Sequence, residues 1–340
     1  MITKEEIRFS HMVVHILDGT VGLPVLSDTE LEYGSDFADF IRAHISKIAS
    51  GDDAKVCQFY EKESDVFPLF ENYKEEDFLS VSKELAEKLY DIMNKNVDIP
   101  AADLLIVQFK DRDEEYFAIL KMNFKTTFTH RTKADGENNY NDIVKYKAVL
   151  PSEGQRLSEA AIIRLRDLRI WLLEKKYEVN GEKANYFSYL FLKCSSNFSP
   201  KAKLNIVTKA VERVQEKNLD EKEVFAAQMK AKSIMQEELS EKGGFVVEEL
   251  ADRIFEEKTE LREAFQEQME KYDMVKQEVI PQSETTTKKY MNQHIFTDNG
   301  IEIKIPMDQY KDSNKVEFIT EEDGSISIVL KNIERLVAKY

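Results

Sequence analysis

The sequence of 340 residues has few cysteines and no long apolar segment. Its only two cysteines, Cys57 and Cys194, lie far apart and form no C-x-x-C pair, which argues against a disulfide framework and a cysteine-based zinc site. No stretch approaches the roughly eighteen consecutive apolar residues that a membrane-spanning helix needs, and the N-terminal MITKEEIRFS has no apolar signal region. We therefore expect a cytoplasmic protein in a reducing compartment, with no membrane partner.

The local signatures of nucleotide-binding and hydrolytic enzymes are also absent. The chain contains no G-x-x-x-x-G-K-[ST], no G-x-G-x-x-G and no G-x-S-x-G. His11 and His15 have the spacing of the H-E-x-x-H zinc motif, but Met12 stands where that motif requires glutamate. Both histidines are predicted to be structural, and we expect no catalytic residue, no metal and no cofactor.

Residues 1–182 are predicted to form an α+β domain. Apolar side chains recur at helical spacing in GSDFADFIRAHISKIAS, with Ser35 or Asp36 as its cap, and again in EEDFLSVSKELAEKLYDIM. Two apolar runs around the polar KDRDEE predict an antiparallel hairpin, and Asn180-Gly181 predicts a tight turn between further strands. We expect the helices to cover one face of this antiparallel sheet.

The rest of the chain is predicted to contain a helical region, a linker and a small β-rich module. Residues 183–278 are predicted to form the helical region. Within it, residues 221–270 have helical periodicity, interrupted by Gly243-Gly244, and their apolar faces could serve a homodimer as well as a core. Residues 279–293 are polar and aperiodic, which is typical of a linker or long loop. Alternating apolar residues in 294–340 predict the C-terminal strands.

The formal net charge of -16 conceals a basic middle third. Residues 101–217 carry 21 basic and 16 acidic side chains, whereas the segments before and after them are strongly acidic. Duplex DNA binding draws much of its affinity from lysine and arginine on phosphates, so the middle third is the region to search for a DNA contact.

One helix concentrates this basic charge. Ser199-Pro200 predicts its start, and four apolar residues recur along its inner face. Cations spaced by four occupy the opposite face, at Lys201, Lys209, Arg213 and Lys217. The alternative is that this face of helix 199–217 is merely solvated. Further candidates for a phosphate-binding stripe are Lys121, Lys125, Arg131 and Arg164, which lie in basic stretches of the same third.

A metal-dependent nuclease is a third interpretation of this region. Asp111, Asp113, Glu114 and Glu115 precede Lys121, and carboxylates beside a lysine can hold Mg²⁺ and stabilise an attacking group. Such sites commonly place an acid two residues before the lysine, where this chain has Ile119. The acids therefore fit a hairpin tip better than a metal site.

Three segments of the chain resemble the bacterial nucleoid-associated protein family of the NdpA/YejK type. They are EEDFLSVSKELAEKL, KANYFSYLFLKCSSNFSPKAKLNIVTKAVERV and GIEIKIPMDQYKDSNKVEFITEEDGSISIVLKNIERL. The resemblance implies a non-enzymatic protein that is located in the bacterial nucleoid and associated with chromosomal DNA. It supplies no catalytic motif and no set of site residues, so the basic positions rest on the charge argument alone.

Two main hypotheses follow. In the first, the protein binds double-stranded DNA through backbone contacts, with low sequence specificity and steep salt dependence. In the second, its acidic regions dock a DNA-processing protein, which recruits it to the nucleoid.

Overall fold

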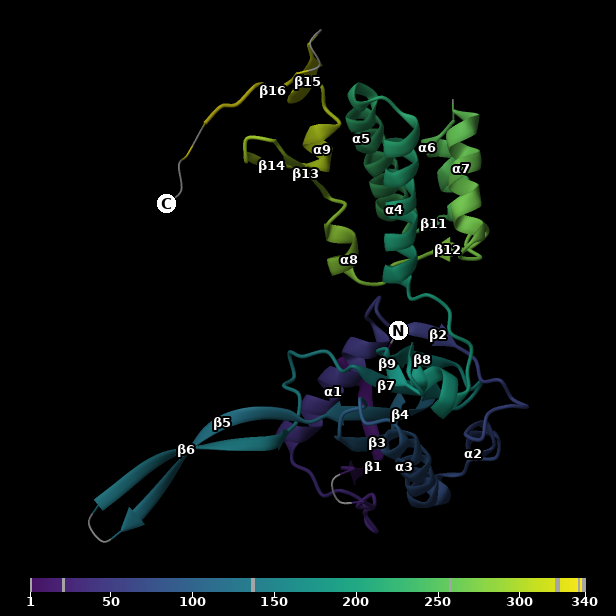
Figure 1. The fold of residues 1–340 in the computed structure, drawn as a ribbon, viewed down its shortest axis with the longest axis vertical. Helices are drawn as coiled ribbons and strands as arrows, with labels where there is room; N and C mark the ends of the chain where they lie inside the picture. The colour runs from purple at the N-terminus through teal and green to yellow at the C-terminus, as the bar shows by residue number, and fades with distance from the viewer. Residues whose placement is uncertain are drawn as a thin grey trace. The chain divides into compact units, whose positions relative to one another are not determined.

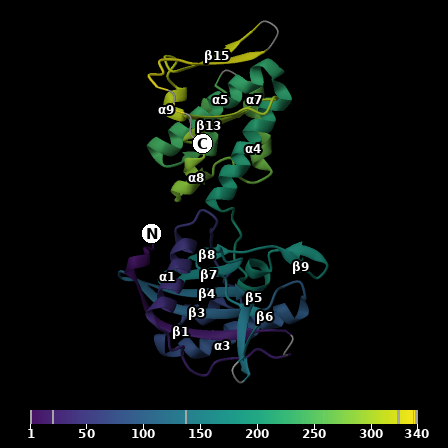
Figure 2. The same cartoon turned by 90° about the vertical axis from the view of Figure 1, so that its left-hand side faces the viewer.

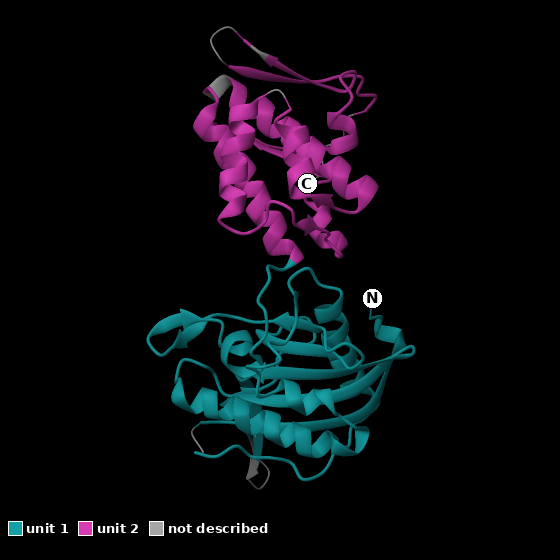
Figure 3. Ribbon diagram, turned by 90° about the vertical axis from the view of Figure 1, so that its right-hand side faces the viewer, with its two compact units in different colours: residues 1–199 teal, residues 200–340 magenta. Residues whose placement is uncertain are grey.

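The computed structural model describes residues 2–19, 22–135, 138–256, 258–321, 325–335 and 337. The chain has an α+β fold and divides into two compact units, residues 1–199 and residues 200–340 (Figure 3). We refer to them as unit 1 and unit 2. The boundary differs from the expected one at 182/183, because Phe187 and Phe191 of the intervening aromatic segment pack into the core of unit 1.

Unit 1 is built on a six-stranded antiparallel sheet with strand order β1-β3-β4-β7-β8-β2 (Figures 1 and 2). Its strands are β1 (Ile7–Leu17), β2 (Lys55–Cys57), β3 (Ala102–Asp111), β4 (Glu114–Asn123), β7 (Glu159–Arg164) and β8 (Ile170–Leu173). The predicted hairpin is confirmed as β3–β4, and Arg112 has a φ of 56° in its turn.

The helical segments of unit 1 are η1 (Lys4–Glu6), α1 (Ser35–Ala49), α2 (Phe67–Glu71), η2 (Glu75–Asp77), α3 (Phe78–Lys95) and the π-helix η3 (Phe187–Leu192). Helices α1 and α3 are the two predicted ones. Gly34, rather than Ser35 or Asp36, is the N-cap of α1, and it provides no side-chain hydrogen bond to the start of that helix.

Helices cover both faces of the sheet, and the expectation of one covered face is wrong. Leu104 and Ile106 of β3 belong to the core that includes α3, whereas Leu105 and Val107 belong to the core that includes α1. Successive strand side chains point to opposite faces. A strand that is buried on both sides therefore has to be apolar at every position, as LLIV is.

A long two-stranded ribbon and a short hairpin complete unit 1. The ribbon consists of β5 (Lys125–Asp135) and β6 (Asn138–Val149), which pair with each other and extend away from the sheet (Figure 1). The short hairpin consists of β9 (Tyr177–Val179) and β10 (Glu182–Ala184). Asn180 and Gly181 form its turn with φ of 52° and 84°, which confirms the predicted tight turn.

Unit 2 has a large apolar core among its helices and a smaller apolar cluster formed by Met229, Ile295, Ile305 and Val316. Its helices are α4 (Pro200–Asn218), α5 (Glu221–Glu237), the π-helix η4 (Glu238–Lys242), α6 (Val247–Ile254) and α7 (Thr259–Glu270). The break predicted at Gly243-Gly244 is confirmed, with Gly243 at a φ of 73°. The two-residue strands β11 (Phe245–Val246) and β12 (Glu278–Val279) pair with each other.

The segment 279–293, which was expected to be a linker, is attached to this core. Val279 and Tyr290 are buried among the helices, and α8 (Glu284–Lys288) lies between them in the chain. Hairpins follow as predicted. Their elements are β13 (Asn292–Phe296), β14 (Glu302–Pro306), α9 (Met307–Tyr310), β15 (Val316–Thr320) and β16 (Ile326–Leu330).

Candidate nucleic-acid interface

Helix α4 separates an apolar face from a basic face, as its sequence predicts. It begins at Pro200, whose fixed φ suits the first helical position. Its inner side chains, Leu204, Val207, Val211 and Val214, are all buried in the core of unit 2. Burying a side chain of this size contributes about 1.5–3 kcal/mol, so the apolar face fixes which residues α4 presents to solvent.

The opposite face of α4 carries exposed cations. Lys209, Arg213 and Lys217 are exposed, and among the described residues their side chains form no hydrogen bond or ion pair. Lys201 is exposed near the start of the same helix. At 1.5 Å per residue, positions 201 to 217 span roughly 24 Å. Each i, i+4 step turns by about 40°, so Lys209, Arg213 and Lys217 lie near one another in one stripe, while Lys201 lies further round the helix.

The C-terminal half of this stripe borders an open cleft between α4 and α7. The cleft has a volume of about 520 Å³ and is lined by Arg213, Glu216, Lys217, Gln268, Lys271 and Tyr272. Three of its residues are cations and only one is an acid. Lys271 follows the last turn of α7, where the carbonyl end of the helix dipole favours a cation.

The sequence did not identify Lys271 and Tyr272 as site residues. Their position just after a helix of mixed charge gives no periodic signal, because they come next to α4 only through the packing of α7. The local basic character of the α4 sequence was sufficient to find Arg213 and Lys217, since both belong to one helix face.

The predicted cations of unit 1 have partners within the protein. The guanidinium of Arg131 donates to Asp142 over 2.8 Å across the ribbon. Arg164 pairs with Asp167, whose hydrogen bond raises the pKa of the guanidinium, and lies over the ring of Trp171. Lys125 donates to the side chain of Gln155. Arg131 and Arg164 are therefore already neutralised locally, unlike the cations of the cleft.

Lys121 is not a surface residue, and its place among the candidate DNA contacts is corrected. It is fully buried on β4, where its ammonium donates to the Pro100 carbonyl over 2.9 Å and to Asn123 Oδ1. Asn123 in turn donates to Glu159. Burial lowers the pKa of Lys121 to about 8. An ammonium without solvent exposure cannot reach a phosphate, so this group is structural.

The ribbon β5–β6 is a second basic surface. Its cations are Lys125, Arg131, Lys133, Lys145 and Lys147, and the carboxylates of its described side chains include only Asp142. It also exposes large apolar side chains, with Phe128 68% and Tyr146 56% exposed. Two-stranded antiparallel ribbons have the width to enter a DNA groove.

The comparison with sequence families identifies the chain. The family described as nucleoid-associated protein YejK matches residues 13–337. The chain belongs to this family. A comparison with curated proteins found no match.

Membership of the nucleoid-associated family establishes a nucleoid-associated role and confirms the resemblance found in the sequence. The match includes the ribbon of unit 1 and helix α4 of unit 2, so it does not by itself select one of these basic surfaces. Among the described residues, no helix is both long and apolar enough to cross a membrane.

The acids considered for a nuclease lie far from Lys121 in this member of the family. Glu114 begins β4 and pairs with Arg166, and Glu115 pairs with Lys110 over 2.7 Å. Lys121 lies seven residues further along the same strand, a distance of roughly 23 Å at 3.3 Å per residue. The carboxylates and the lysine therefore do not form one catalytic site.

His11 and His15 both lie on β1, and each forms hydrogen bonds with other residues of unit 1. Burial of His11 opposes its protonation, but hydrogen bonds to Glu30 and Glu75 raise its pKa overall. His15 bonds to Ser82 Oγ at 3.0 Å and accepts from the Ser27 amide at 3.1 Å. Among the described residues, no group of three or more histidine, cysteine or acidic side chains is placed to hold a metal ion.

Proposed function

We propose that this nucleoid-associated protein binds double-stranded DNA directly, through phosphate contacts from the α4–α7 cleft. One observation carries the proposal: Arg213, Lys217 and Lys271 line a single open cleft, and among the described residues none of the three side chains has an ion-pair partner. Like charges placed together repel one another, and an anion that binds between them removes that repulsion. A DNA phosphate is an anion of suitable size and charge.

The geometry favours backbone contact over base reading. The cations lie on the solvent-facing side of a helix that is anchored by its apolar face, so their reach is set by flexible side chains. Contacts of this kind position a protein on DNA without specifying sequence. We therefore propose low sequence specificity and no catalytic step.

The ribbon β5–β6 supports the same proposal as a second contact. Lys133 and Lys145 are exposed and form no ion pair among the described residues. Lys145 is paired with Phe128 across the ribbon and therefore lies on the same face as Phe128. Lys133 follows Phe128 by five positions, an odd number, so Lys133 and Lys145 lie on opposite faces of the ribbon. A ribbon with a cation on each face can meet both walls of a groove.

The proposal is tested by measuring the affinity of the full chain for a labelled random-sequence duplex across a salt series in EDTA. We expect Arg213→Glu with Lys217→Glu, two residues that line the cleft, to weaken binding at least about tenfold at constant salt and to reduce the slope of log affinity against log salt by about 2, since each phosphate contact contributes about 0.9. The fold is monitored by circular dichroism.

The matched control is Lys230→Glu with Lys311→Glu. Both lysines are exposed in unit 2 outside the cleft, and the change in net charge is the same. If the control weakens binding as much as the cleft variant, only net charge matters and the cleft assignment is wrong. If the parent protein fails to bind DNA even at low salt, direct binding is wrong and a protein partner has to provide the nucleoid association.

A further inference from the structure

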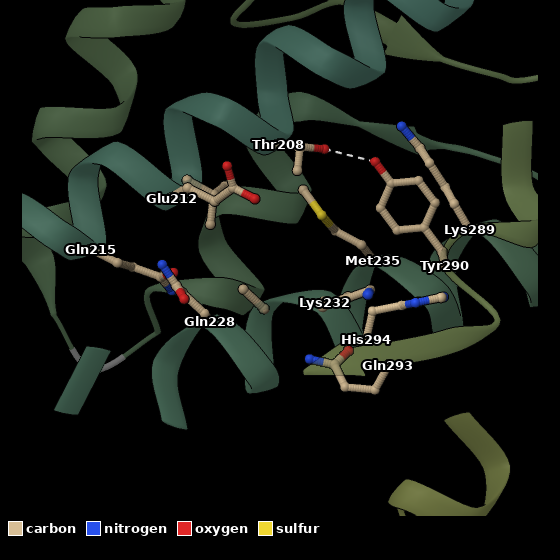
Figure 4. A pocket seen from close by; sticks show the side chains of 12 residues that line it. Thr208, Glu212, Gln215, Gln228, Lys232, Met235, Lys289, Tyr290, Gln293 and His294 are labelled. Carbon is tan, nitrogen blue, oxygen red and sulfur yellow. Dashed lines mark hydrogen bonds between the residues drawn. The ribbon is translucent and has the colours of Figure 1, made fainter. Parts of the chain in front are cut away.

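Unit 2 contains a second hollow, distinct from the basic cleft. It has a volume of about 390 Å³ and lies between α4, α5 and the segment 289–294 (Figure 4). None of its lining residues lines the basic cleft. Val211, Ala231 and Met235 give it an apolar part, while the remaining lining residues are mostly polar. A concave site of this size that combines an apolar part with polar groups has the dimensions of a small-molecule site.

Two buried glutamines leave acceptor atoms unsatisfied at this cavity. Gln215 is 2% exposed, and its Nε2 donates to the Ala227 carbonyl over 3.1 Å, but its Oε1 has no partner. Gln293 is 6% exposed, and its Nε2 contacts Met229 Sδ, while its Oε1 also has no partner. Leaving a buried acceptor without a donor costs about 1–3 kcal/mol. Both residues line one cavity, and rotation of either amide toward it would present the oxygen to a ligand that brings N–H or O–H donors.

Charged groups line the same cavity. Lys232 is half-buried and forms no hydrogen bond or ion pair among the described residues. Burial lowers the pKa of both Lys232 and Lys289. Lys289 donates to Asn205 Oδ1 over 3.0 Å and lies over the Tyr290 ring. Burial also raises the pKa of Glu212, and repulsion from Glu216 adds to that rise.

The polar groups are separated within the cavity. In Figure 4, Gln215 and Gln228 lie on one side, Lys232, Lys289 and His294 lie on the other, and Met235 lies between them. Tyr290 is held in place because its hydroxyl bonds to Thr208 Oγ1 over 2.8 Å, while Thr208 donates to the Leu204 carbonyl. Gln293 lies beside Lys232 and His294 in Figure 4, so a ligand that satisfies both sides must carry donors at one end and both an anionic group and a donor at the other.

We propose that this cavity binds a nucleoside monophosphate. The base edge supplies an N–H donor to Gln215, and the phosphate lies beside Lys232 and Lys289. Because Gln215 Nε2 is used by the Ala227 carbonyl, its Oε1 can accept a single hydrogen bond from an amino or imino group of the base. The apolar Met235 and Val211 contact the body of the ligand. The proposal concerns a free small molecule, and it does not depend on DNA binding at the α4–α7 cleft.

The test is calorimetric titration of the DNA-free full chain with AMP, GMP, CMP and UMP, and with two partial ligands. Ribose 5-phosphate has the anion without the base, and the matching nucleoside has the base without the phosphate. We expect at least one nucleotide to bind about tenfold more tightly than either partial ligand, because each lacks one set of contacts.

Two variants assign the ends of the ligand. Lys232→Met is expected to reduce nucleotide affinity to that of the nucleoside, whereas Gln215→Leu is expected to reduce it to that of ribose 5-phosphate. Lys230→Met is the matched control, because Lys230 is exposed on the same helix and does not line the cavity. Lys232 is half-buried, so its variant keeps the test valid if Gln215→Leu unfolds.

Three outcomes would overturn the proposal: no nucleotide binds more tightly than ribose 5-phosphate, Lys232→Met and Lys230→Met behave alike, or only an oligonucleotide occupies the cavity. Loss of duplex binding in the cleft variants with nucleotide binding retained would affect only the proposed DNA contact. The two proposals can therefore fail separately.

Discussion

The cations predicted as DNA contacts in unit 1 differ from those on α4 in unit 2, although Lys133 and Lys145 of the unit 1 ribbon also form no ion pair among the described residues. In unit 1, Arg131, Arg164 and even the buried Lys121 have partners within the protein. In unit 2, Arg253 is paired in the same way with Glu237 and Glu238, but Arg213 and Lys232 form no ion pair among the described residues. A cation that is paired within the protein stabilises the structure. A cation without such a partner is available to bind an anionic ligand.

The buried polar groups show the same contrast. Both ring nitrogens of His15 in unit 1 have partners: Nδ1 accepts from the Ser27 amide, and Nε2 is hydrogen-bonded to Ser82 Oγ. Gln215 and Gln293 of unit 2 each keep an oxygen without a partner beside a cavity. Unit 1 has orphaned atoms too, such as Glu159 Oε1, but that residue is fully buried and lines none of the cavities described above. An unsatisfied group indicates binding only where a ligand can reach it.

The largest expected effect tests whether unit 1 and unit 2 are stabilised independently of each other. Phe117 is fully buried in unit 1 and contacts the rings of Phe70, Tyr73 and Phe78. Phe117→Ala should destabilise unit 1 by about 3–5 kcal/mol, because it removes apolar contacts and leaves a cavity. Fluorescence of Trp171, the only tryptophan, reports the unfolding of unit 1 in denaturant.

Phe128→Ala is the control for this measurement, since Phe128 is largely exposed on the ribbon. We expect it to change stability by less than about 0.5 kcal/mol. Nucleotide and DNA binding by unit 2 should survive Phe117→Ala in native buffer. If binding is lost together with the stability of unit 1, the functional contrast between the units is incorrect.

A smaller effect concerns pH. Burial lowers the pKa of His44 in unit 1 to about 4, with Lys47 acting in the same direction and Glu153 opposing it. The unfolded chain therefore binds more protons than the folded one between about pH 6.5 and pH 4, and stability falls as pH falls through this window. Between pH 7 and pH 5, one such histidine contributes a loss of about 2 kcal/mol.

Replacement of His44 by leucine should make unit 1 less sensitive to acid. The measurement is the denaturation midpoint from Trp171 fluorescence at pH 7, 6 and 5, compared between the parent and His44→Leu. Burial also lowers the pKa of His15 to about 4, so the stability of His44→Leu should still depend on pH in part. Equal slopes for parent and variant would exclude His44 as the source.

The sequence predicted what local pattern determines. The β3–β4 hairpin, the start of α4 at Pro200 and the turn at Asn180-Gly181 follow from alternation, capping and turn preferences within a few residues. It did not predict that α1 and α3 cover opposite faces, although the continuous LLIV run contained that signal. Lys121 was misplaced because its charge was considered without its apolar neighbours Leu120 and Met122.

The candidate sites depend on packing to a greater extent. Arg213 and Lys217 could be found because they share one helix face, whereas Lys271 joins them only when α7 packs against α4. The cavity beside Gln215 combines residues more than seventy positions apart, from α4 to His294. No spacing rule brings such residues together, since their proximity results from tertiary structure.

The smallest effect compares one backbone feature in both units. Gly181 and Gly243 have φ of 84° and 73°, and a Cβ added at either would meet no atom within 4 Å. Alanine at each therefore adds only the cost of a left-handed backbone, about 1–2 kcal/mol. Gly181→Ala should lower the denaturation midpoint of unit 1 measured by Trp171 fluorescence. Gly243→Ala should lower the midpoint of the part of the 222 nm signal that does not follow Trp171 fluorescence, since α1 and α3 of unit 1 also contribute at that wavelength. Because the substitutions are chemically identical, a shift of both transitions by either one would mean that the units unfold as a single cooperative structure.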